Sequence, residues 1–221
     1  MTKISKRLLA VADLIENNSK VIDIGCDHGL LDIYLAQNKN CHTLATDISA
    51  TCLEKAKENI KLNNLEEKIQ TKVTNGLEGI EYNNYDYVVI TGMGTNTIIK
   101  ILENKTPSKL IIQSNNNIEE LKRFLTKKYK LLEEKIIYEC GIYYVILYLE
   151  KGKQKLKYSD YIIYNKENKD YINHLYNKYN KILNKMPNKY IFKKLKLYRK
   201  LLVLKKYIKH WFKELMLYFF L

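Results

Sequence analysis

Apolar and polar positions alternate in blocks over the first 150 residues. Short runs that predict strands lie at 21–25, 42–47, 69–73, 85–91 and 109–113, and the apolar run at 21–25 is typical of a buried strand. Between and before them, apolar residues recur every three or four positions, which predicts helices at 4–16, 30–36, 50–62, 95–103 and 118–128. Strands that alternate with helices in this way predict parallel β-α-β units.

The pattern changes twice after residue 128. Two apolar-rich runs at 131–137 and 143–150 are joined near Gly141 without a helix, which predicts an antiparallel hairpin at one sheet edge. Beyond Gly152, helical apolar spacing over 158–184 and 190–219 predicts two long helices that form an α-helical hairpin or coiled coil.

These elements define the expected fold class and domains. Five parallel strands with an antiparallel edge hairpin form an α/β sheet of the Rossmann-like class I methyltransferase type. We expect this sheet in a domain at residues 1–151 and the basic helical hairpin in a domain at residues 152–221.

Charge is divided unevenly between the two parts. The formal net charge is +14, yet residues 1–150 hold 19 basic and 20 acidic side chains, while residues 151–221 hold 19 basic and only 4 acidic. A basic region of this size favours a polyanionic partner such as RNA, although a basic face can also be simply solvated. The expected phosphate-binding side chains are Lys193, Lys194, Lys196, Arg199, Lys200, Lys205, Lys206 and Lys209. Four tyrosines either stack on bases or belong to the helical core: Tyr158, Tyr161, Tyr164 and Tyr171.

Several protein classes are disfavoured by the sequence. No apolar run approaches the length of a membrane span, and Lys3, Lys6 and Arg7 interrupt any signal-peptide core. The four cysteines are scattered, with no C-x-x-C pair, so neither a disulfide framework nor a zinc site is indicated. We expect a reduced, cytoplasmic, metal-free monomer. Apolar residues lie beside lysines at 211–212 and 217–221. These residues either form the docking end of the helical hairpin or bind a membrane surface.

The end of the first strand carries candidate chemistry. Gly25 lets the backbone turn and approach a ligand closely, and Asp27 and His28 follow it. The three-glycine dinucleotide fingerprint is absent, and the carboxylate of Asp27 would repel a pyrophosphate. A cationic cofactor without phosphate, S-adenosyl-L-methionine (SAM), suits this loop better. The competing interpretation is that Asp27 and His28 only cap the next helix.

The next two strands end in residues suited to an adenosine-type cofactor. Asp47 can accept hydrogen bonds from both ribose hydroxyls. Asn75 can donate to and accept from adenine, or form a simple Asn-Gly turn. The expected cofactor-binding residues are Asp23, Gly25, Asp47, Ile48, Asn75, Gly76, Thr91 and Gly92.

The fourth and fifth strands end in loops suited to a substrate base. Met93 between two glycines gives the backbone room and offers an apolar wall, unless the loop is a plain strand-to-helix turn. Gln113 and Asn115 can read a base edge or cap the next helix. Arg7 can pair with a substrate phosphate or form a surface salt bridge. The expected substrate-binding residues are Arg7, Met93, Gly94, Gln113 and Asn115.

These strings together resemble one family. Ser5-Lys6-Arg7-Leu8, Asp23-x-Gly25-x-Asp27-His28-Gly29-x-Leu31, Gly92-Met93-Gly94 and Gln113-x-Asn115 are similar to those of bacterial tRNA (adenine(22)-N1)-methyltransferases. The resemblance covers about residues 3–150 and extends to the helical hairpin. It implies SAM-dependent methylation of N1 of an adenosine in the D-loop of tRNA. Two positions differ from the family pattern: Thr95 replaces a usual glycine, and Ser114 replaces a usual proline.

The implied chemistry assigns the catalytic roles. Adenine N1 has its own lone pair, so no residue must deprotonate it before attack, and positioning dominates. Asp27 and His28 are the expected catalytic residues, Asp27 stabilising the charge on the methylated ring and either one accepting a proton. The alternatives are a class I methyltransferase for another RNA, such as rRNA, and a non-catalytic RNA-binding protein with this fold.

Overall fold

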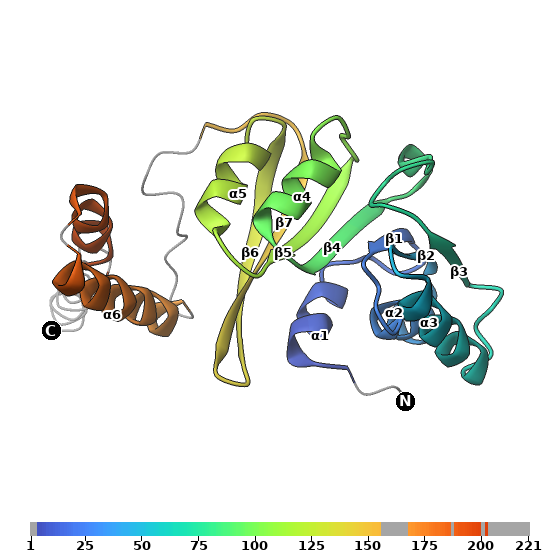
Figure 1. The fold of residues 1–221 in the computed structure, drawn as a ribbon. Coiled ribbons are helices and arrows are strands. Elements are labelled where there is room, and N and C mark those ends of the chain that lie inside the picture. The colour runs from blue at the N-terminus through green and yellow to red at the C-terminus, as the bar shows by residue number, and fades with distance from the viewer. Residues whose placement is uncertain (1–3, 156–167, 187, 200–201, 203–221) are drawn as a thin grey trace, which may run out of the picture. The chain divides into compact units, whose positions relative to one another are not determined.

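The computed structural model describes residues 4–155, 168–186, 188–199 and 202 (Figure 1). The chain divides into two compact units, residues 1–156 and residues 157–221. The expected helical residues 158–167 and those beyond 202, with the tyrosines and lysines named for them, lie outside the described residues, as does Lys200.

The first unit is built on one seven-stranded sheet with the order β3-β2-β1-β4-β5-β7-β6. The strands are β1 (Lys20–Ile24), β2 (His42–Asp47), β3 (Ile69–Val73), β4 (Tyr87–Met93), β5 (Lys109–Ser114), β6 (Tyr129–Glu139) and β7 (Ile142–Lys151). The first five are parallel, and β7 pairs antiparallel with β5 and with β6. The predicted parallel sheet with an antiparallel edge hairpin is therefore confirmed.

Helices connect the parallel strands and cover the sheet. They are α1 (Lys6–Ala12), α2 (Leu30–Asn38), α3 (Ala50–Leu62), α4 (Thr95–Leu102) and α5 (Ile118–Leu125), with a 3-10 turn η1 (Tyr82–Asn84). Right-handed crossovers lead outward from β1 in both directions, which places α2 and α3 on one face and α4 and α5 on the other. The first helix is shorter than predicted because the chain turns after Ala12, and its N-terminus is capped by Ser5.

Apolar side chains fill the space between the helices and the strands. On the α1–α2 side, Val11 and Leu35 pack with Val21 and Val89, all fully buried. This core fixes the strand ends, so the loops that follow β1, β2, β4 and β5 meet along one edge of the sheet.

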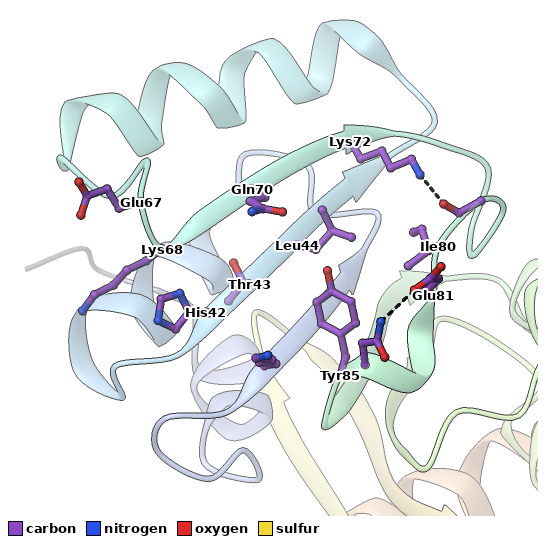
Figure 2. A pocket seen from close by; sticks show the side chains of 13 residues that line it. His42, Thr43, Leu44, Glu67, Lys68, Gln70, Lys72, Ile80, Glu81 and Tyr85 are labelled. Atoms are coloured by element: carbon purple, nitrogen blue, oxygen red, sulfur yellow. Dashed lines mark hydrogen bonds between the residues drawn. The ribbon is translucent and has the colours of Figure 1, made fainter.

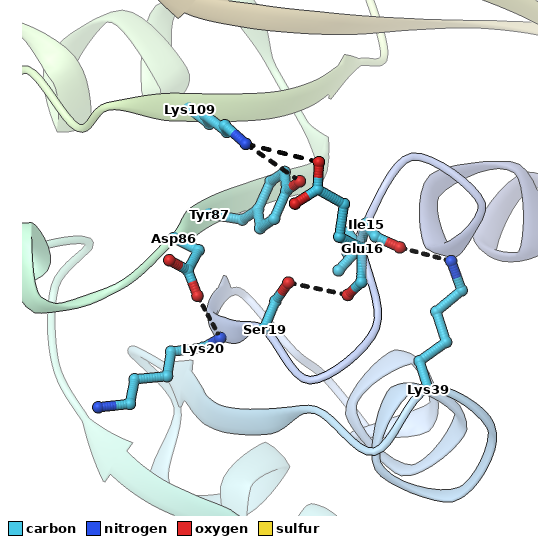
Figure 3. A network of polar contacts seen from close by, with 8 residues as sticks. All are labelled: Ile15, Glu16, Ser19, Lys20, Lys39, Asp86, Tyr87 and Lys109. Carbon is cyan, nitrogen blue, oxygen red and sulfur yellow. Dashed lines mark hydrogen bonds and ion pairs between the residues drawn. The ribbon is translucent and has the colours of Figure 1, made fainter.

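A polar network closes the opposite edge, at the amino ends of the strands (Figure 3). The backbone N–H of Lys20 donates to the carboxylate of Asp86 at 2.8 Å. The ammonium of Lys109 lies 3.5 Å from the hydroxyl of Tyr87 and 3.8 Å from the carboxylate of Glu16. Burial raises the pKa of Tyr87 to about 12, so the phenol keeps its proton near neutral pH.

The second unit contains α6 (Lys169–Lys185) and a helix at residues 189–199 that pack together. Ile172 and Tyr198 are buried at their contact, and the rings of Tyr179 and Tyr198 stack with centroids 5.7 Å apart. Tyr171 is also buried, so its ring is not free to stack on bases.

One expected phosphate-binding side chain of this unit is placed differently. Lys194 is 7% exposed, and its ammonium donates to the hydroxyl of Tyr179 and lies 4.7 Å from the ring centroids of Tyr179 and Tyr190. The interpretation of Lys194 as part of the basic surface is wrong, because cation–π contacts hold it inside. Lys193, Lys196 and Arg199 are exposed, as predicted.

Two kinds of feature are absent from the described residues. No helix among them has the length and apolarity that a membrane span requires. Nor do they contain a group of three His, Cys, Asp or Glu side chains placed to hold a metal ion.

Candidate active site

The loop after β1 bends sharply and presents Asp27 to solvent. Gly25 and Asp27 both have positive φ, 76° and 53°, and the backbone N–H groups of Gly25 and Cys26 both donate to the carbonyl of Thr46. The side chain of Asp27 is 68% exposed, and its carboxylate lies 3.6 Å from Nε2 of His28. Helix α2 starts after Gly29 without any side-chain cap, so the capping interpretation of Asp27 and His28 is wrong.

Asp47 lies directly beside this loop. Its carboxylate accepts the backbone N–H of Ser49 at 2.8 Å and that of Asp27 at 3.4 Å. Each carboxylate oxygen keeps further acceptor capacity. The neighbouring Ile48 exposes 72% of its surface at the same edge. A half-buried acceptor next to an apolar side chain suits a ribose joined to a flat base.

The loop after β3 begins with a turn at residues 75–78. The side-chain amide of Asn75 donates to the carboxylate of Glu78 at 3.1 Å, and the backbone N–H of Glu78 points back toward the carbonyl of Asn75. Gly76 has φ 61°, and a Cβ there would lie 2.8 Å from the side chain of Ile101. The structure therefore places Asn75 in an Asn-Gly turn while leaving it exposed beside the end of β2.

The loops after β4 and β5 are bonded to each other. The side-chain oxygen of Gln113 accepts the backbone N–H of Gly92 at 3.0 Å, and the amide of Asn115 donates to the carbonyl of Gly92 at 2.7 Å. Gln113 is wholly buried although it is polar, which these bonds explain. Asn117, in a left-handed conformation, precedes α5, so Gln113 and Asn115 are not its cap.

Met93 links the loop after β4 to the loop after β1. A Cβ on Gly25 would lie 2.4 Å from the terminal methyl of Met93, so this side chain lies directly over the first loop. Sequence spacing gave no sign of this contact, because the two residues come from different strands. Gly92 differs, since a Cβ there would meet only the guanidinium of Arg7, at 3.9 Å.

Arg7 reaches the same place from α1. Its guanidinium donates to the side-chain oxygen of Gln113 at 3.0 Å and lies 5.5 Å from the ring centroid of Tyr144. Among the residues that the structure describes, Arg7 forms no ion pair, so the surface salt bridge is wrong. The guanidinium instead sets the position of Gln113, which holds Gly92 in turn.

The two departures from the family pattern contact each other. The hydroxyl groups of Thr95 and Ser114 are 2.9 Å apart, and both donate to the carbonyl of Asn116, at 2.7 and 2.8 Å. Both residues are buried. The hydroxyl pair joins the start of α4 to the end of β5.

A pair of buried carboxyl groups lies beneath the site. Asp23 and Asp32, from β1 and α2, are 4% and 0% exposed. Burial raises the pKa of Asp23 well above its usual value, the charge of Asp32 raises it further, and the charge of Arg7 opposes this. Burial also raises the pKa of Asp32, to about 6. Sequence reasoning missed Asp32, which appeared to be an ordinary helical residue.

A groove of about 510 Å³ lies elsewhere, over one face of β1, β2 and β3 (Figure 2). His42, Gln70 and Lys72 line it together with Tyr85. It contains none of the expected site residues. The loops at the carboxyl ends of the strands remain the candidate site because the reactive groups gather there.

Comparison with known proteins bears on these loops. A family model described as a methyltransferase domain matches residues 4–147. The tRNA (adenine(22)-N(1))-methyltransferase of Bacillus subtilis is 34% identical over 163 residues, which cover 71% of this chain and 68% of that protein. The chain belongs to the tRNA (adenine(22)-N(1))-methyltransferase family. The resemblance seen in the sequence, and the enzyme class that it implied, are thereby confirmed.

Solved structures of similar proteins agree in fold and cofactor. The TrmK protein of M. capricolum, in complex with the cofactor product S-adenosylhomocysteine, is 34% identical with a TM-score of 0.74, covering 93% of this chain and 98% of that one. The Streptococcus pneumoniae protein Sp1610, in complex with SAM, is 27% identical with a TM-score of 0.81, covering 90% and 100%. SAM is the cofactor of this tRNA (adenine(22)-N(1))-methyltransferase family member.

The loops of this chain fit SAM by their own chemistry. The first loop carries the carboxylate of Asp27 and has no basic side chain except that of His28, and the carboxylate of Asp47 lies beside it at the end of β2. This end of the sheet therefore favours a cation and disfavours a phosphate. A Cβ on Gly92 would meet nothing closer than the guanidinium of Arg7, at 3.9 Å. The residues present therefore match a cofactor with a sulfonium and an ammonium group.

Proposed function

We propose that this chain transfers the methyl group of SAM to N1 of adenosine 22 in the D-loop of tRNA. The observation that carries the proposal is the meeting of Asp27, Asp47 and the Gly92-Met93-Gly94 loop at the carboxyl ends of neighbouring parallel strands. SAM, when bound, supplies an electrophilic methyl group on a sulfonium.

The cofactor side of the site is formed by β1, β2 and their loops. Asp47 binds the ribose hydroxyls, for which its carboxylate has acceptor capacity left after its two backbone N–H donors. Ile48 packs on one face of the adenine, and Asn75 reaches its edge. Gly25 lets the backbone pass close to the cofactor. Asp23 is buried, so we assign it to the support of the loop.

The substrate side is formed by β4 and β5. The target adenine must leave its stack to expose N1, and Met93 offers an apolar surface for the displaced ring. Gly92 and Gly94 keep that surface open. Gln113 and Asn115 hold the loop through Gly92, and Arg7 holds Gln113.

Asp27 stabilises the developing charge, and Asp27 or His28 accepts the proton. Methylation at N1 leaves a positive charge on the adenine ring, and the exposed carboxylate of Asp27 stabilises it. The exocyclic amine of the product can then lose a proton to Asp27 or His28, whose side chains lie 3.6 Å apart. No base is needed before attack, because N1 already has a lone pair.

The helical hairpin supplies the affinity for tRNA phosphates. Lys196 is exposed on its second helix, whereas Lys194 is enclosed by tyrosines. Lys196→Ala should weaken tRNA binding and reduce its salt dependence by about one counterion. Lys194→Ala should act through hairpin stability instead, seen as a lower melting temperature. Equal salt slopes for Lys196→Ala and the unmodified protein would contradict the phosphate role.

The direct test is methyl transfer from labelled SAM to unmodified tRNA, followed by nucleoside analysis and mapping. We expect 1-methyladenosine at position 22. Label in another nucleoside, or in rRNA but not tRNA, would overturn the proposed substrate. We further propose that the enzyme acts as a cytoplasmic monomer, which sedimentation of the free protein and of its tRNA complex would check.

A further inference from the structure

The β6–β7 hairpin reaches past the edge of the sheet where the candidate active site lies. Gln113, near the end of β5, pairs with Ile146 of β7, and β7 begins four residues earlier, at Ile142. At about 3.3 Å per residue, the turn extends roughly 15 Å beyond Gln113. Figure 1 shows this hairpin projecting beyond the other strands.

The tip of the hairpin is well ordered by its own backbone. Its ladder continues to the pair Glu139 and Ile142, leaving a two-residue turn of Cys140 and Gly141. Both turn residues have positive φ, 49° and 80°, as the tight turns favoured in two-residue hairpins require. The side chains at the tip are therefore held in a fixed register.

The tip is also tied to the active site. The carboxylate of Glu139 accepts the backbone N–H groups of Lys6 and Arg7, at 2.8 and 3.3 Å. Arg7 in turn donates to Gln113, which holds the backbone of Gly92. A continuous set of bonds thus joins the hairpin tip to the loop that receives the base.

The two faces of the tip differ in what covers them. Tyr144, paired with Ile137, lies on the face that Arg7 covers. Tyr138 and Tyr143, the next pair along, point to the opposite face, with ring centroids 4.6 Å apart. Tyr138 is 57% exposed on this face. An aromatic surface therefore stands open at the hairpin tip, beyond the carboxyl end of β5.

We propose that Tyr138 is a stacking platform for an unpaired nucleobase that neighbours the target adenosine in the tRNA. The proposal rests on the proposed function, since it deepens the recognition of the same substrate. Flipping the target leaves the adjacent base without its stacking partner, and an exposed aromatic ring can replace it. Stacking on a tyrosine face accepts any base, so this contact adds affinity and not base identity.

The first experiment compares three variants with the unmodified protein in tRNA binding and in KM for tRNA. Tyr138→Ala should weaken both by about ten-fold, while Tyr138→Phe, which keeps the ring, should stay within about two-fold. Leu132→Ala is the matched control, because Leu132 is 49% exposed on the same strand but far from the tip. KM for SAM should not change in any variant, and the melting temperature should fall slightly only in Tyr138→Ala, which loses the ring contact with Tyr143.

Three results would overturn the platform. They are tRNA affinity of Tyr138→Ala equal to that of the unmodified protein, an equal loss in Leu132→Ala, or an equal loss in Tyr138→Phe. Failure of the proposed function is a different result, in which the unmodified protein does not methylate tRNA. In that case the tRNA affinities of the variants still test the stacking.

A spectroscopic experiment tests the contact directly. The chain has one tryptophan, Trp211, so Tyr138→Trp combined with Trp211→Phe places the only indole at the hairpin tip. Stacking on a base should quench its emission when tRNA is added. Emission that stays unchanged at saturating tRNA would contradict the platform.

Discussion

The amino ends and the carboxyl ends of the same parallel strands use similar side chains for different purposes. At the amino ends, Asp86 and Lys109 are bonded within the protein, to Lys20 and to Tyr87. At the carboxyl ends, Asp27 and Asp47 face an open loop with acceptor capacity left over. The comparison shows that one edge of the sheet contributes stability and leaves the other free to bind ligands.

The largest effect is expected from Asp27→Asn. Asparagine tolerates the positive φ of this position, so the substitution removes the charge without straining the loop. The rate constant kcat should fall about 100-fold, equivalent to about 2.7 kcal/mol, because the charge on the methylated ring loses its partner. SAM affinity, measured by calorimetry, should change little. An unchanged kcat would remove Asp27 from catalysis.

The next largest effect is expected beneath the carboxyl ends, at Asp32. Its folded-state pKa of about 6 lies above the unfolded value near 4, so the folded protein retains a proton between these values. Stability should therefore fall as the pH rises from about 4 to above 6. Asp32→Asn stays neutral and should gain on the order of 2–3 kcal/mol at pH 8, with little gain at pH 4.

Denaturant unfolding across this pH range checks the Asp32 prediction. Asp13→Asn is the control, because Asp13 is exposed and loses little hydration on folding. Equal pH dependence in Asp32→Asn and the unmodified protein would show that the buried carboxyl group does not control the transition.

A matched pair of carboxylates tests the two edges directly. Asp47 and Asp86 each accept one backbone N–H at 2.8 Å, at opposite ends of the sheet. Asp47→Asn should raise KM for SAM about ten-fold, since the ribose hydroxyls lose a charged acceptor. Asp86→Asn should leave KM for SAM unchanged and lower only the melting temperature. Steady-state kinetics would contradict the comparison if both variants raised KM equally.

The smallest effect is expected from Tyr87→Phe, at the closed edge. The substitution removes the hydroxyl that Lys109 contacts and keeps the buried ring. Stability should fall by about 1 kcal/mol, measured by denaturant unfolding, while methylation kinetics stay constant. A loss of kcat at unchanged stability would mean that this edge also takes part in the reaction.

The sequence predicted the features that depend on local pattern. The central strands β1, β4 and β5 are short apolar runs because both of their faces are buried, and the helical spacing at 50–62 corresponds to α3. The candidate residues Asp27, Asp47 and Gly92 lie at or just after the carboxyl ends of strands, and parallel topology brings them to one edge.

The sequence could not predict contacts that depend on tertiary packing. Met93 lies over Gly25, and Arg7 bonds Gln113 across 106 positions, for which no spacing rule exists. Lys194 has the local pattern of a surface residue, yet Tyr179 and Tyr190 of the helical hairpin enclose it. Such pairings are set by how the elements approach one another, so they become visible only in the folded chain.

The hydroxyl pair of Thr95 and Ser114 has a consequence for protein engineering. A library that varies positions 95 and 114 one at a time would miss the coupling between them, because the two hydroxyls contact each other and share the carbonyl of Asn116 as an acceptor. Restoring the glycine and the proline that are usual in the family therefore calls for both exchanges in one step. Positions 95 and 114 are best treated as a single two-residue unit of design.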